Sequence, residues 1–377
     1  MSVVNNQLTL VKGDNLTVMR LLPDKSFDMI YLDPFFFTNR NFTKVDITNQ
    51  KSYSFEDKFT SMEDYLEWLS ERVKECDRLL KDTGTLWIHC DDTAQAYIQV
   101  ELDKIFGFQN RLDTIAVKRH VSEAHLSQKF CPRNLDFLFR YVKTLDKFTW
   151  NPPKRELSQQ EIDQKVKKRD WRIEKRSGRY YDTQPITRSN NDYNKHETRT
   201  FYYPDGKPIT LNTKIGWSWS QQKVDEEWRK DPHIFHFTRN RFTKEISSVR
   251  IRQYKSTTKN LSNIWTHDPV MIPSGSKESL GYPTQKSESF LKILVKASSN
   301  PGDSILDIFG GSGSMLSVAQ QLQRRCFMIE LKDDACKLIK KRMVHSNLKY
   351  FEFNQEKNNL EEKPILILSL DKFIQKE

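Results

Sequence analysis

The sequence predicts an α/β protein in which a mostly parallel sheet is interrupted by an inserted basic domain. Three observations predict this class. Strand-like apolar runs alternate with helical runs over residues 1–150, the same alternation returns from Leu261, and a polar segment at 151–260 separates the two stretches. An alternation of strands and helices is typical of parallel sheets with helices packed on them.

The first stretch divides into elements by its apolar periodicity. We expect, in chain order, a strand at 7–12, a helix at 15–22, a strand at 27–32, a helix at 61–80, a strand at 85–90 and a helix at 93–106. The helix at 61–80 is the clearest, because Met62, Leu66 and Leu69 begin an apolar series at helical spacing. Gly84 and Gly107 follow the two longer helices as punctuation.

The second stretch repeats this pattern after the polar segment. We expect a helix at 288–297, a strand at 304–308, a helix at 315–322 and a strand at 325–329. The tail, 350–377, contains one more apolar run at 364–370, for which the sequence predicts no place in the fold. The sequence thus divides into 1–150, 151–260, 261–349 and a C-terminal extension at 350–377.

Composition excludes several classes of protein. The chain has 377 residues, 37% hydrophobic, with 12 Gly and 14 Pro, which rules out collagen, low-complexity polymers and disulfide scaffolds. No run of about 18 apolar residues could span a membrane, and the first residues show no secretory signal. Five cysteines without CxxC spacing predict reduced thiols in the cytoplasm. We propose no metal, because His89 suits a packed or hydrogen-bonded role and His120 and His125 lack partners at ligand spacing.

The excess of positive charge lies in one segment. The chain has a formal charge of +11, and residues 151–260 hold 25 Lys and Arg against 14 Asp and Glu, a net of +11, so the remaining 36 charges of each sign cancel. Aromatic residues such as Trp171 and Trp228 are interleaved with this charge. Such a segment favours a polyanionic partner over a merely solvated surface. Arg111, Lys118 and Arg119, outside it, could equally contact DNA phosphate or lie on a solvated face.

A glycine-rich loop marks a candidate ligand site. The run Asp307-Ile308-Phe309-Gly310-Gly311-Ser312-Gly313 follows a predicted strand and opens a helix, where glycines allow close approach of the backbone to a ligand. Glu330 ends the next strand, 19 residues beyond Gly311, near the offset at which an acid reaches a ribose hydroxyl. No Gly-Lys-Ser/Thr follows, so a Walker-type phosphate loop is excluded. This feature alone does not separate NAD from S-adenosylmethionine.

A second candidate site follows the strand at 27–32. Asp33-Pro34-Phe35-Phe36 places a carboxylate and aromatic rings at the carboxyl end of that strand, where α/β sheets bind ligands. The Asp33 carboxylate and the Pro34 carbonyl could accept both protons of a planar amine, while an aromatic ring stacks on the base that carries it. The base would first have to leave its duplex, at a cost of a few kcal/mol. An ordinary turn beside the core is the alternative.

Together these motifs resemble the β class of amino-directed DNA methyltransferases. In that family an Asp-Pro-Pro-Tyr/Phe motif precedes a target-recognition domain, and a Phe-x-Gly-x-Gly motif that binds S-adenosylmethionine comes last. The same permuted order holds here for Asp33–Phe36, the basic segment 151–260 and Phe309–Gly313. Other stretches resemble family motifs as well: Lys12-Gly13-Asp14, 38–42, 79–92, 103–107 and 281–286.

The resemblance implies a fold, a reaction and a set of roles. The fold would be Rossmann-like, with 1–150 as the catalytic half, 261–349 as the cofactor-binding half and 151–260 as the target-recognition domain. S-adenosylmethionine would lie against Phe309–Gly313 and Glu330, with Asp14 near its adenine and Lys286 near its amino-acid end. Asp33 would bind the target amine. Double-stranded DNA would be the substrate, a cognate restriction endonuclease and a second copy of the chain would be possible partners, and no membrane would be involved.

Two departures from the family pattern keep alternatives open. Phe35 stands where the family has its second proline, and Ser287 stands where a proline usually follows Gln-Lys. Phe35 lacks the ring that fixes φ near −65°, so the corner is less preorganised. The acidic first letter of the motif favours N6 of adenine over N4 of cytosine. A catalytically silent DNA-binding relative, and a methyltransferase of RNA or protein amines, are the remaining alternatives.

Overall fold

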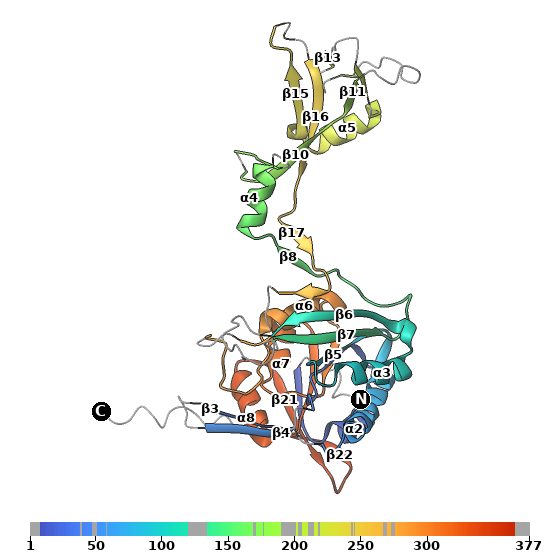
Figure 1. Ribbon diagram of the computed structural model, residues 1–377, viewed down its shortest axis with the longest axis vertical. Helices are drawn as coiled ribbons and strands as arrows, with labels where there is room; N and C mark the ends of the chain where they lie inside the picture. The colour runs from blue at the N-terminus through green and yellow to red at the C-terminus, as the bar shows by residue number, and fades with distance from the viewer. Residues whose placement is uncertain are drawn as a thin grey trace, which may run out of the picture. The chain divides into compact units, whose positions relative to one another are not determined.

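The computed structural model describes 8–37, 40–46, 51–57, 59–119, 134–168, 171–175, 177–189, 201–202, 206–209, 215–217, 219–242, 244, 246–266, 270–272 and 276–365, and the statements below concern these residues. The chain forms two compact units (Figure 1). Unit 1 comprises Met1–Pro153 and Leu261–Glu377, and unit 2 comprises Lys154–Asn260. The expected insertion at 151–260 falls on unit 2.

Unit 1 is built on one large sheet. Within the described residues the strand order is β18-β6-β7-β5-β2-β19-β20-β1-β21-β22. These strands are β1 (Leu8–Lys12), β2 (Phe27–Leu32), β5 (Leu80–Cys90), β6 (Arg111–Lys118), β7 (Leu135–Val142), β18 (Ile264–Trp265), β19 (Ser304–Asp307), β20 (Arg325–Glu330), β21 (Leu348–Asn354) and β22 (Asn359–Lys363). Six neighbouring pairs are parallel, including β2–β19, β19–β20 and β20–β1, and three are antiparallel, so the prediction of a mostly parallel sheet is confirmed.

Helices cover both faces of this sheet (Figure 1). On one face lie α1 (Asn15–Arg20), α2 (Met62–Leu79) and α3 (Gln95–Phe106), with η1 (Phe108–Asn110) after α3; on the other lie α6 (Glu288–Ser298), α7 (Ser314–Gln321) and α8 (Asp333–Arg342). Successive residues of β2 enter opposite cores, Ile30 toward α2 and Met29 toward α6. Burial on both faces explains why the central strands appear in the sequence as apolar runs.

Several elements of unit 1 were not predicted from the sequence. These are β6, β7, β18, β21, β22, α8 and the antiparallel pair β3 (Arg40–Asp46) and β4 (Lys51–Asp57). β6 alternates apolar and polar residues only in its second half, and its partner β7 is placed by pairing with the distant β5. No helix in the described part of the chain is long and apolar enough to cross a membrane.

Some sequence-based expectations fall where the structure gives no description. Cys76, Cys90, Cys326 and Cys336 are buried and form no disulfide, whereas Cys131 lies outside the described residues. The same holds for His120, His125, residues 38–39 of the family-like segment and 366–370 of the apolar run in the tail.

Unit 2 is more regular than the sequence indicated. Its elements are β8 (Lys154–Glu156), α4 (Gln159–Lys167), β9 (Arg172–Ile173), β10 (Tyr180–Pro185), β11 (Thr187–Ser189), β12 (Phe201–Tyr202), β13 (Pro208–Ile209), β14 (Ile215–Trp217), α5 (Gln221–Lys230), η2 (Pro232–Ile234), β15 (Phe235–Arg239), β16 (Ile246–Tyr254) and β17 (Thr258–Asn260). The sheet β15-β16-β10-β9 has its own core, with Val224 of α5 packed among strand residues. The polar composition of 151–260 did not indicate this sheet, because Val249 and Ile251 alternate with Arg250 and Arg252, whose charge hid the strand pattern.

Candidate functional site

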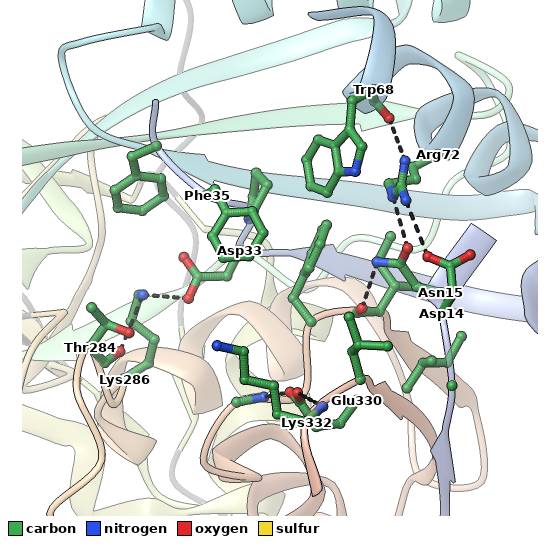
Figure 2. A pocket seen from close by; sticks show the side chains of 18 of the residues that line it. Asp14, Asn15, Asp33, Phe35, Trp68, Arg72, Thr284, Lys286, Glu330 and Lys332 are labelled. Carbon is green, nitrogen blue, oxygen red and sulfur yellow. Dashed lines mark hydrogen bonds and ion pairs between the residues drawn. The ribbon is translucent and has the colours of Figure 1, made fainter. Parts of the chain in front are cut away.

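The predicted motifs come together at one edge of the main sheet. β2, β19, β20 and β1 are adjacent and parallel, so their carboxyl ends share that edge. Asp33 follows β2, the glycine-rich loop follows β19, Glu330 ends β20, and Asp14 comes two residues after β1. A cavity of about 1060 Å³, including its open mouth, lies between them (Figure 2).

Most of the residues predicted for the site line this cavity. Those on its wall are Asp14, Asp33, Pro34, Phe35, Phe36, Lys286, Phe309, Gly311 and Glu330. Asp307 and Gly310 line a smaller adjoining recess. Gly313 lines neither: it precedes α7 at φ 77°, and an added Cβ would lie 3.0 Å from Ile339 Cγ1. Gly313 therefore affects the loop through its packing against Ile339 and not through contact with the cavity.

The glycine loop needs its glycines for space and for backbone geometry. Gly310 donates its N–H to the Ile329 carbonyl at 2.9 Å, and a Cβ there would lie 2.8 Å from Met328 Cγ. Gly311 has φ 53°, a region that favours glycine, and donates its N–H to Glu330 Oε2 at 2.7 Å. The loop is thereby held against the end of β20.

Two buried acids lie beneath this loop. Glu330 accepts a second backbone N–H, from Lys332, at 2.8 Å, and burial raises the pKa of its carboxyl group. Asp307 is fully enclosed, and burial raises its pKa to about 7, although the Phe309 N–H donates to it at 3.0 Å. The Glu330 carboxylate has further lone pairs, so it can still accept a hydrogen bond from a ligand hydroxyl group.

A buried arginine organises the wall around Asp14. Arg72 of α2 donates from Nε to Asn15 Oδ1 at 2.8 Å and pairs through Nη2 with Asp14 Oδ2 at 3.3 Å (Figure 2). Its guanidinium lies 4.2 Å from the ring centroid of Trp68. Asp14 also caps α1 by accepting the Thr17 N–H at 2.9 Å.

The sequence analysis missed Asn15, Trp68 and Arg72, together with the cavity-lining Tyr282, Thr284 and Lys332. A signal for Arg72 was present, because it lies three residues after Leu69 and four before Cys76, on the face of α2 that is otherwise apolar.

The corner after β2 contains an ion pair. Lys286 Nζ donates to Asp33 Oδ2, and both side chains are mostly buried, 7% and 18% exposed (Figure 2). The Lys286 ammonium also lies 5.6 Å from the ring centroid of Phe36. The resemblance placed Lys286 near the amino-acid end of the cofactor; in the structure its ammonium contacts two groups expected to hold the target base.

Aromatic packing supports the corner where the family proline is absent. The Phe35 carbonyl accepts the Tyr65 O–H at 2.7 Å, and the Phe35 ring lies 5.8 Å from that of Trp68. Phe37 has φ 57°, a conformation that is unfavourable for a bulky residue unless its surroundings impose it. Its ring packs against Phe59 and Tyr65, which hold it there.

Behind Asp33 lies a buried histidine. His89 is fully buried and hydrogen-bonded to Asp136, as predicted for a packed histidine. Arg119, for which DNA contact and a solvated face were expected equally, donates from Nε to Asp136 Oδ1 at 2.6 Å and is mostly buried, so the expectation of a solvated face was wrong. Its contact with DNA stays a prediction.

Comparison with known proteins shows one family. The sequence model of a family described as DNA methylase, N6_N4_Mtase, matches residues 27–341. The type II methyltransferase M.EcaI of Enterobacter cloacae is 25% identical, covering 89% of this chain and 69% of that protein. The DNA adenine methyltransferase YhdJ of Escherichia coli K12 is 23% identical, covering 89% and 82%. The Mod subunit of the type III restriction-modification enzyme EcoPI of Escherichia phage P1 is 21% identical, covering 88% and 57%.

Proposed function

This chain belongs to the N6/N4 DNA methylase family, whose members transfer a methyl group from S-adenosylmethionine to an amine of a DNA base, and we propose that it methylates N6 of adenine at a specific sequence in duplex DNA. One observation carries the proposal: Asp33, the first residue of the catalytic motif, and the glycine loop line one cavity. The acidic residue at that position and the adenine methyltransferase among the relatives support adenine as the target.

The residues of the cavity fit S-adenosylmethionine. Gly311 brings backbone close to the cavity, and Asp14, Asp33 and Glu330 line it, with Asp307 in the adjoining recess. Carboxylates suit a ligand that carries sulfonium and ammonium charges. When bound, this cofactor supplies an electrophilic methyl group. Glu330 would hold the ribose of the cofactor. Phe309 and the cavity wall around Asp14 would hold its adenine.

The chain's own residues would then hold the target amine. Asp33 and the Pro34 carbonyl accept hydrogen bonds from the two N–H groups of the amine, and this directs the nitrogen lone pair toward the methyl carbon. Phe36 stacks on the base. In the structure the Lys286 ammonium donates a hydrogen bond to Asp33 Oδ2 and lies near the Phe36 ring. The ammonium would therefore move partly aside when the target base enters. No covalent enzyme intermediate is needed, and positioning provides most of the rate.

The test is methyl transfer from labelled S-adenosylmethionine to mixed-sequence duplex DNA, followed by digestion to nucleosides. We expect labelled N6-methyldeoxyadenosine, and a loss of about 10²-fold or more in Asp33→Asn. Asp334→Asn, in an exposed acid of α8, is the matched control and retains activity.

Other products would change the proposal. Labelled N4-methyldeoxycytidine would reassign the base. A preference for single-stranded RNA, or label only in protein, would contradict the DNA substrate for this chain. Binding of DNA and cofactor without transfer would identify a silent relative; Phe35→Pro, which restores the family proline, would then locate the defect.

We extend the proposal to partners and place. The Mod relative is part of a restriction-modification enzyme, which supports a cognate endonuclease for this chain. A homodimer is the second expected partner, testable by light scattering with and without DNA. We also propose that the enzyme acts in the cytoplasm, where free cysteines such as Cys76 and Cys90 stay reduced.

A further inference from the structure

His89 lies between two carboxylates at the back of the candidate active site. Its Nε2 is 3.0 Å from Asp136 Oδ2, and its Nδ1 is 3.4 Å from Asp33 Oδ1 and 3.2 Å from the Tyr31 hydroxyl. The imidazole is fully buried, and the rings of Phe36 and Phe290 pack beside it. This geometry connects the acid of the catalytic motif to β5 and β7.

The pattern of donors leaves two states for the ring. Asp136 accepts, so Nε2 carries a proton. Nδ1 then either is bare and accepts the Tyr31 O–H, or is protonated and donates to Asp33. Asp33 Oδ1 is buried and accepts no hydrogen bond from the described residues as they stand, so only the second state provides a donor for it. A buried acceptor without a donor is unfavourable by about 1–3 kcal/mol.

The surrounding charges favour the protonated state. Asp33, Asp136 and Asp91 face this cluster, against two fixed cations, Lys286 on Asp33 and Arg119 on Asp136 and Asp91. A protonated His89 balances them. α6 presents only the Phe290 ring to the imidazole.

Two neighbouring groups keep fixed protonation states. Burial by itself raises the pKa of Asp136, but the hydrogen bond and charge of His89, together with Arg119, hold it at about 2. Burial raises the pKa of Tyr31 well above its ordinary value, so its phenol remains a donor.

We propose that His89 is a positioning residue that carries a proton and donates it from Nδ1 in a hydrogen bond to Asp33 Oδ1, orienting that carboxylate toward the target amine. The inference rests on the proposed function and extends it to residues outside the family motifs. A ring whose Nδ1 accepts the Tyr31 O–H instead would leave Asp33 Oδ1 without this donor.

The test uses amides that imitate one ring nitrogen each. Asparagine places its N–H₂ near Nδ1, toward Asp33, and glutamine places its N–H₂ near Nε2, toward Asp136. We expect His89→Asn to stay within about tenfold of wild-type kcat, while His89→Gln and His89→Ala fall about 10²-fold, as for a misplaced catalytic group. Dissociation constants for S-adenosylmethionine and DNA stay within about threefold.

The opposite order overturns the proposal: activity in His89→Gln but not in His89→Asn would show that the Asp136 contact alone matters. Wild-type activity in all three variants would overturn it as well. If the His89 variants do not fold, Tyr31→Phe decides. It removes the hydroxyl that competes for Nδ1 and leaves Asp33 as the partner of that nitrogen, so we expect kcat to stay within about threefold of wild type. A fall in kcat of about 10²-fold in Tyr31→Phe contradicts the proposal.

A second measurement does not depend on methyl transfer. In ¹⁵N-histidine-labelled protein at neutral pH, we expect both His89 ring nitrogens to be protonated, and Nδ1 to be unprotonated in Asp33→Asn, where its carboxylate partner is missing. A neutral His89 in the wild type overturns the inference. If wild-type protein methylates no DNA, the proposed function fails while this measurement still decides the state of His89.

Discussion

Arg72 ties three parts of the cavity wall together. One side chain, 8% exposed, contacts Asp14 and Asn15 at the end of β1 and Trp68 on its own helix. Hydrogen bonds that involve a charged group contribute about 1.5–3 kcal/mol when they are buried. The wall nearest the expected cofactor adenine thus depends on a residue in α2, a different segment of the chain.

We therefore expect Arg72→Met to weaken S-adenosylmethionine binding about tenfold, equivalent to about 1.4 kcal/mol, and to lower the melting temperature. The methionine keeps most of the length of the side chain but removes the arginine donors to Asn15 Oδ1 and Asp14 Oδ2. Titration calorimetry measures the affinity, with Arg20→Met, an exposed arginine of α1, as the control. Unchanged affinity for S-adenosylmethionine in Arg72→Met would show that this part of the cavity wall does not bind the cofactor.

Asp307 predicts a dependence of stability on pH. Burial raises its pKa from 3.8 to about 7, so the folded protein binds the proton more tightly than the unfolded chain. The contribution of Asp307 to the free energy of unfolding is therefore greatest below about pH 4, declines as the pH rises to about 7, and stays at its lower value above that.

Asp307→Asn lacks this titration while keeping an acceptor for the Phe309 N–H. We expect the free energy of unfolding, measured by urea without cofactor, to decline less between about pH 4 and 7 in the variant than in the wild type. Parallel pH profiles for the two proteins would mean that Asp307 is ionised in the folded state across that range.

At the scale of elements, the loop between β19 and α7 is shaped by close packing. Its three glycines are needed for different reasons. A Cβ on Gly310 would collide with Met328, and Gly311 adopts a positive φ beside the cavity. Gly313 also has a positive φ and packs against α8. The loop, the end of β20 and the start of α7 therefore form one packed arrangement.

Gly313→Ala should destabilise the protein more than Gly302→Ala. Both glycines have positive φ, which is unfavourable for alanine by about 1–2 kcal/mol. Only Gly313 faces a neighbour, Ile339 Cγ1 at 3.0 Å, whereas a Cβ on Gly302 meets nothing within 4 Å. Overpacking adds about 1–3 kcal/mol. Urea midpoints of the two variants measure the difference, and equal midpoints would contradict close packing of the loop on α8.

At the scale of the whole molecule, charge and chemistry are divided between the units. Unit 2 holds the net charge of +11, and the remainder of the chain is neutral. The cavity is lined entirely by residues of unit 1. Affinity for DNA phosphate and the transfer reaction therefore depend on different parts of the sequence.

Removing charge from unit 2 should change the salt dependence of DNA binding. Replacing the exposed Arg172 and Arg239 by alanine should reduce the slope of log K against log salt by up to about 2, since each phosphate contact contributes about 0.9. Lys104→Ala with Lys357→Ala, two exposed lysines of unit 1, is the matched control. Fluorescence anisotropy across a salt series measures the slope, and an equal effect of both pairs would argue against unit 2 as the DNA-binding unit.

Much of unit 1 was predictable because its signals are local. The apolar run of β2, the helical spacing of α2 and the glycines after β19 each lie within a few neighbouring residues. Order along the chain then placed Asp33, Glu330 and the loop at strand ends, and the parallel sheet brings them to one edge.

The fold class, the strand ends that carry the motifs and the segment that holds the charge therefore follow from local sequence patterns. Which side chains meet depends on the folded arrangement: Lys286 contacts Asp33, Arg72 contacts Asp14, and His89 contacts Asp136. These partners are 253, 58 and 47 residues apart in the chain. Periodicity reports which face of an element is buried, but the identity of a distant partner is set by sheet order and packing, which no local pattern contains.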